Sequence, residues 1–129
     1  MTTTIPRRVF LSAVIPALLA LAALAPAAPR AQDFLVTVDD VPVMPGLTEV
    51  PGSGFVFDKP DGRIAEATAR GPVTRAAVLA FYAETLPQLG WTMAAAGRFR
   101  RDDEGLTLTF STQGRDLIVR FQVAPLIDR

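Results

Sequence analysis

Residues 106–123 read LTLTFSTQGRDLIVRFQV, and this stretch decides the fold. Apolar and polar residues alternate on both sides of the turn formers at 113–116. A period of two is typical of a strand with one face buried and the other in water, and so short a turn makes the two strands antiparallel neighbours. The side chains predicted to face the core are Leu106, Leu108, Phe110, Leu117, Val119, Phe121 and Val123.

Upstream, the sequence alternates again on both sides of Lys59-Pro60-Asp61-Gly62. Two alternating runs joined by Pro-Asp-Gly predict a hairpin of residues 54–58 and 63–69. Ala65, Ala67 and Ala69 share one face of its second strand, and such small side chains allow a helix to approach closely. Shorter strands are predicted at 91–95 and 98–101.

Between these strand regions the apolar spacing changes to that of a helix. Thr74 is a good N-cap for a helix from Arg75 to about Leu89. Pro87 should kink or tighten the last turn of this helix, and Gly90 is placed to end it. One stripe of this helix is predicted to face the core, formed by Val78, Phe81, Tyr82, Thr85 and Leu89 and flanked by Leu86.

The predicted fold class is therefore α+β. One helix packs on one face of a mostly antiparallel sheet of four to six strands, in the order ββαβββ(β). This single domain spans residues 54–125. Residues 32–53 hold Pro42, Pro45, Gly46, Pro51 and Gly52, which predicts an extended, proline-rich arm that wraps the core.

Residues 1–31 are predicted to be a signal peptide. Arg7 and Arg8 precede an apolar run from Val9 to Ala25, and small residues follow up to Ala31, which is the order that a signal peptidase substrate needs. The Arg-Arg-Val-Phe-Leu sequence also fits a twin-arginine signal, so both export routes stay open. An uncleaved membrane anchor is a third reading, although the run is short for crossing a bilayer. We expect a periplasmic or secreted protein.

Composition excludes several functions. The chain has no histidine and no cysteine, which removes the commonest general base, the usual zinc ligands, thiol nucleophiles and disulfides. Three of the 13 basic residues, Arg7, Arg8 and Arg30, precede residue 32, whereas all 13 acidic residues follow it. Residues 32–129 therefore have 10 basic and 13 acidic residues and a net charge of about −3. A weakly acidic domain is a poor nucleic-acid binder. No cofactor and no metal site is predicted.

Three segments carry a resemblance: Phe81-Tyr82, Leu86-Pro87-Gln88-Leu89-Gly90-Trp91 and Phe99-Arg100-Arg101. Together with the alternating strands, they make residues 58–123 similar to small exported bacterial proteins of unknown function. In those proteins a Phe-Tyr helix ends in Leu-Pro-x-Leu-Gly-Trp and feeds a β-hairpin. The resemblance implies the architecture and brings no catalytic residues with it.

Several local motifs are better explained by a structural role than by binding or catalysis. The acidic run Asp102-Asp103-Glu104 is typical of a solvated hairpin turn. Pro51-Gly52-Ser53-Gly54 precedes a strand and lacks a following lysine, unlike a phosphate-binding loop. Tyr82 and Trp91 are expected in the core rather than in a ligand-stacking pair.

The best candidate for binding is the helix-free face of the sheet. Alternation places Arg98, Arg100, Arg120 and Glu66 there, together with Thr107, Thr109 and Gln122. Arginines over an extended polar surface recognise carboxylates or phosphates through bidentate contacts.

From these observations we expect a non-enzymatic binding or assembly module, with no catalytic residue. Its partner would be an envelope protein or a small acidic ligand. The alternative is a small periplasmic enzyme, or an enzyme subunit, that uses carboxylates or Tyr82.

Overall fold

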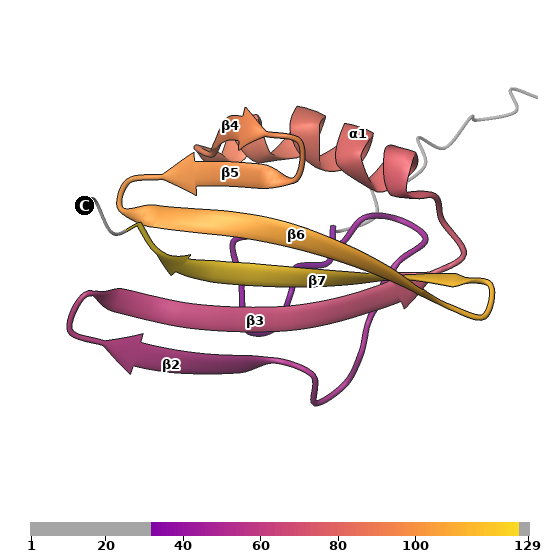
Figure 1. The fold of residues 1–129 in the computed structure, drawn as a ribbon, viewed down its shortest axis with the longest axis horizontal. Coiled ribbons are helices and arrows are strands. Elements are labelled where there is room, and N and C mark those ends of the chain that lie inside the picture. The colour runs from indigo at the N-terminus through magenta and orange to yellow at the C-terminus, as the bar shows by residue number, and fades with distance from the viewer. Residues whose placement is uncertain (1–31, 127–129) are drawn as a thin grey trace, which may run out of the picture. The chain divides into compact units, whose positions relative to one another are not determined.

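A computed structural model describes residues 32–126 of the protein. Its strands lie in the spatial order β1-β3-β7-β6-β5-β4, and β2 pairs with β3 on the edge that β1 also uses (Figure 1). All pairs are antiparallel. The elements along the chain are β1 (Thr48–Glu49), β2 (Phe55–Lys59), β3 (Gly62–Gly71), α1 (Arg75–Thr85), the 3₁₀ helix η1 (Leu86–Leu89), β4 (Thr92–Ala95), β5 (Arg98–Arg101), β6 (Glu104–Gln113) and β7 (Asp116–Pro125).

The predicted fold class is wrong in strand number and order. The sheet has seven strands, three before the helix and four after it, where four to six in the order ββαβββ(β) were expected. The strand that precedes the predicted hairpin is β1, in which Thr48 pairs with Arg70 and Glu49 with Ala69. Two residues between prolines carry no alternating pattern, so this strand depends on its partner and not on its own composition.

The predicted hairpins are present. Lys59 pairs with Gly62 at the β2–β3 turn, and Gln113 pairs with Asp116 at the β6–β7 turn. Pairing of β3 with β7 joins the two hairpins into one sheet. The alternating apolar residues form its buried inner face, where Ala65, Ala67, Ala69, Val119, Phe121 and Val123 are fully buried.

Helix α1 packs against this inner face. Its N-cap is Thr74, whose side chain accepts a hydrogen bond from the Ala77 amide. The rings of Tyr82 and Phe121 of β7 meet edge to face at 5.3 Å. Pro87 lies in η1, which replaces the last helical turn, and Gly90 ends it in the left-handed conformation.

The predicted core stripe of this helix needs a correction. Val78, Tyr82 and Leu86 are buried, but Phe81 is only partly buried and Leu89 is 39% exposed. The change from α to 3₁₀ geometry after Thr85 rotates Leu89 away from the predicted stripe, whereas Phe81 lies beside that stripe with its ring against Tyr82.

The segment before β1 also covers the inner face. Leu35, Val38 and Val41 are buried in the same core cluster as the three alanines of β3. This segment, 33–47, is called the arm below. A Cβ atom on Gly71 of β3 would lie 1.9 Å from the carbonyl oxygen of Gly46, so glycine permits this close approach. The small residues of β3 thus make room for the arm as well as for α1.

The predicted signal peptide, residues 1–31, lies outside the described residues. Within residues 32–126, neither helix is long and apolar enough to cross a membrane.

Candidate functional site

The outer face of the sheet holds all four predicted site residues. Directly opposed residues in an antiparallel sheet share a face. The register pairs Glu66 with Gln122, Gln122 with Thr107, and Thr107 with Arg98, which makes one row across four strands. Neighbouring rows contain Arg120 opposite Thr109, and Arg100 opposite Gly105.

Arg120 and Glu66 neutralise each other. The Arg120 Nε donates a hydrogen bond to the Glu66 carboxylate, and this bond raises the pKa of Arg120. Glu66 is 8% exposed although it lies on the outer face. A carboxylate that is removed from water needs such a partner. This pair therefore does not offer a free charge to a ligand.

Arg98 and Arg100 differ from Arg120. Neither forms an ion pair with any residue in 32–126. They line a hollow of about 340 Å³ that also includes Gly105, Thr107 and Leu126. A Cβ atom on Gly105 would lie 2.9 Å from the Leu126 Cδ2, so glycine at this position lets Leu126 form an apolar wall. Gly105 and Leu126 could not be predicted as part of a site, because their contact depends on the β6–β7 register.

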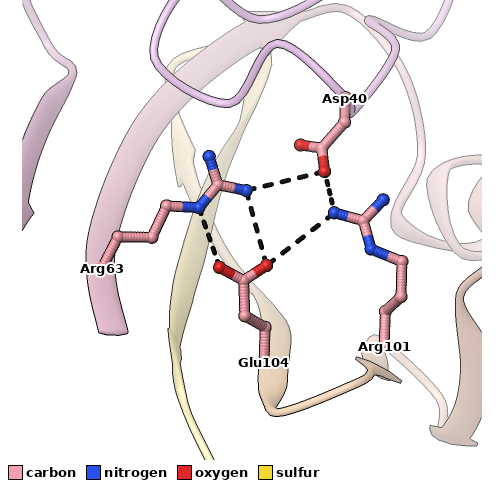
Figure 2. A network of polar contacts seen from close by, with 4 residues as sticks. All are labelled: Asp40, Arg63, Arg101 and Glu104. Atoms are coloured by element: carbon pink, nitrogen blue, oxygen red, sulfur yellow. Dashed lines mark hydrogen bonds and ion pairs between the residues drawn. The ribbon is translucent and has the colours of Figure 1, made fainter. Parts of the chain in front are cut away.

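A second polar cluster joins the arm to the sheet (Figure 2). Asp40 from the arm pairs with Arg101 of β5 and with Arg63 of β3, the latter at 3.5 Å. The Arg63 Nε donates to Glu104 at 2.8 Å, and this hydrogen bond raises the pKa of Arg63. The Arg101 guanidinium also stacks 4.3 Å above the ring of Trp91. Asp40, Arg63, Arg101 and Glu104 are together called the clasp, because their ion pairs connect the arm, β3, β5 and β6.

The other motifs are structural. Tyr82 is fully buried, and its hydroxyl donates to the Pro42 carbonyl at 2.7 Å and accepts from the Met44 amide at 3.2 Å. Burial raises the pKa of Tyr82. Trp91 is 2% exposed, in agreement with its predicted place in the core. In the described part of the chain, no group of three or more acidic residues is arranged to hold a metal ion.

One exposed feature was not predicted as a site. Phe55, Val56 and Phe57 are 47%, 50% and 57% exposed on β2. Their only strand partner in residues 32–126 is β3, which leaves the far edge of β2 open (Figure 1). The sequence signal was the apolar run itself, since three consecutive apolar residues fit a strand buried on both faces better than an edge strand.

Comparison of the chain with protein-family models, with curated proteins and with solved structures finds no match. The resemblance to small exported bacterial proteins therefore stays a prediction.

Proposed function

We propose that this protein is an exported, non-enzymatic binding or assembly module that recognises an acidic group with the outer face of its sheet. The observation that carries the proposal is the position of Arg98 and Arg100, two guanidiniums that form no ion pair within residues 32–126 and lie beside a hollow with an apolar wall. Of the other arginines of residues 32–126, Arg63, Arg70, Arg101 and Arg120 are engaged in ion pairs and Arg75 lies over the Phe110 ring, while Arg115 is exposed at the β6–β7 turn, outside this hollow.

The residues available for catalysis support binding over an enzyme. The Tyr82 hydroxyl is fully buried and engaged on both sides, so a substrate has no access to it. The carboxylates of Asp40, Glu66 and Glu104 are held by arginines. General acid–base catalysis needs a group within reach of a bound substrate, and histidine is absent from the chain.

The chemistry of the hollow defines the class of ligand. Guanidinium groups form charge-assisted hydrogen bonds with carboxylates and phosphates. Leu126 and the side-chain-free surface at Gly105 fit an apolar group next to that charge. The ligand is therefore an acidic group with an apolar neighbour, as in an acidic segment of an envelope protein or in a small organic acid.

The proposed location rests on the amino-terminal sequence. Arg7, Arg8 and the apolar run after them predict export to the periplasm or beyond. Intact-mass analysis of the exported protein tests this, and we expect an N-terminus near Ala28 or Gln32. Recovery of Met1 in a membrane fraction would contradict cleavage.

Binding is tested with a defined probe, a short peptide of alternating glutamate and leucine, and the full chain. Chemical-shift mapping should show changes confined to residues 98–107 and 126. Replacing both Arg98 and Arg100 by glutamine should weaken binding by about tenfold, which corresponds to about 1.4 kcal/mol. Binding should also weaken with salt, because exposed charges are screened.

Two controls make the test specific. Arg115→Gln removes an exposed arginine at the β6–β7 turn, far along the sheet from the hollow, and should leave affinity unchanged. A peptide with glutamine in place of glutamate should bind poorly. Equal affinity of the double variant and the wild type would refute the proposed site.

A further inference from the structure

The open edge of β2 has a symmetry that points to its partner. Phe55-Val56-Phe57 reads the same in both directions, and Gly54 and Asp58 flank it. Successive amide groups of a strand point to opposite sides, so about half of those in β2 face away from β3. Pro60 has no N–H group, and the Ser53 amide is bonded to the Val50 carbonyl, so the stretch available for pairing is 54–58, centred on Val56.

We propose that β2 pairs antiparallel with β2 of a second copy of this chain, about a two-fold axis at Val56. In this arrangement Phe55 of each copy lies opposite Phe57 of the other, and the two Val56 residues lie opposite each other. Aromatic pairs opposite each other stabilise antiparallel strands. An isologous contact of this kind closes on itself and gives a dimer, not a fibre.

The charges near β2 fit the same register. Asp58 comes opposite Gly54 of the second copy, and Lys59 comes opposite Ser53, so no like charges face each other. Beside Ser53 lies a hollow of about 310 Å³ lined by Glu49, Pro51, Gly52 and Gly54. The Glu49 carboxylate on the rim of this hollow already accepts hydrogen bonds from the Val36 amide, so Lys59 of the second copy stays in water at this end of the contact. Registers centred on Asp58 or Lys59 would instead bring identical charges together.

The small apolar area exposed on β2 limits the strength of the β2–β2 contact. Taking about 200 Å² for a phenylalanine side chain, the three exposed residues cover roughly 300 Å² per copy. A stable dimer buries about 1,000 Å² or more in total. The pairing is therefore reversible and falls apart on dilution. It does not depend on the proposed role of Arg98 and Arg100.

A single introduced cysteine tests the two-fold axis, because the chain has no cysteine of its own. Opposed Cα atoms in antiparallel strands lie about 4.5 to 5.5 Å apart, which suits a disulfide. Val56→Cys in the full chain should give a disulfide-linked dimer under mild oxidation. The matched control is Met93→Cys, since Met93 has the same 50% exposure and lies on the opposite edge strand, β4. Equal linking of both variants would overturn the proposal.

Charge exchange tests the register in solution. Sedimentation equilibrium of the wild type should show a monomer–dimer equilibrium that Val56→Lys and Val56→Glu each abolish, while Met93→Lys leaves it intact. Mixing the two Val56 variants should restore a one-to-one dimer, detected by native mass spectrometry. Circular dichroism checks that each variant is folded. A wild type that stays monomeric at every concentration, open-ended oligomers, or no rescue in the mixture would contradict the two-fold pairing.

Discussion

Tyr82 joins the helix to the arm through one hydroxyl group that donates to Pro42 and accepts from Met44. We expect Tyr82→Phe to lower the free energy of unfolding by about 1 to 3 kcal/mol, because it leaves a carbonyl and an amide without their partner. Urea unfolding measures this. A loss near zero would mean that the Tyr82 hydroxyl does not help to hold the arm.

The same hydroxyl makes stability depend on pH. Tyr82 of the unfolded chain ionises near pH 10, whereas burial raises the pKa of the folded one. The folded form therefore keeps a proton that the unfolded form loses, so this contribution is complete below about pH 10 and declines above it. The stability difference between the wild type and Tyr82→Phe should narrow as the pH rises beyond that value. A difference that stays constant would indicate that the hydroxyl ionises normally in the folded state.

At the scale of the elements, the clasp fixes the arm to the sheet. Replacing Asp40 by asparagine leaves the guanidiniums of Arg63 and Arg101 facing a neutral group. We expect a loss of about 1 to 3 kcal/mol, between the values for exposed and for buried pairs. Limited proteolysis should then cut within residues 33–47 faster than in the wild type. Asp39→Asn is the control, because Asp39 is exposed and forms no ion pair in the described residues; equal cleavage of the two variants would argue against the clasp.

The elements also show what could be predicted from sequence. Alternation located the hairpins β2–β3 and β6–β7 and placed Arg98, Arg100, Arg120 and Glu66 on the outer face, because a strand's faces follow from its own residues. Ion pairs were not predictable. Asp40 and Arg101 are 61 positions apart, and Glu66 and Arg120 are 54 apart, so each contact depends on how distant segments meet. The arm was predicted to wrap the core, but the burial of Leu35, Val38 and Val41 in particular was not predicted, since the arm has no regular period.

On the scale of the whole molecule, protection of backbone amides should follow the position of each strand in the sheet. β7 lies between β3 and β6, whereas β2 and β4 lie at edges (Figure 1). Hydrogen exchange should therefore be slowest in β7 and the facing halves of β3 and β6, where amides open only with global unfolding. In dilute protein, we expect amides of β4 and the outward amides of β2 to exchange fastest. Uniform protection across the sheet would show that edges and centre open together.

The central place of β7 also has a consequence for biosynthesis. A ribosome makes β7 after every other strand of the sheet, yet β3 and β6 are hydrogen-bonded into one sheet only through β7, which pairs with both. Until residue 125 has left the exit tunnel, the nascent chain can hold the β2–β3 hairpin and the strands β4, β5 and β6 only as two separate parts of the sheet. The complete sheet, and the outer face that depends on its register, can therefore form only after β7 has been made.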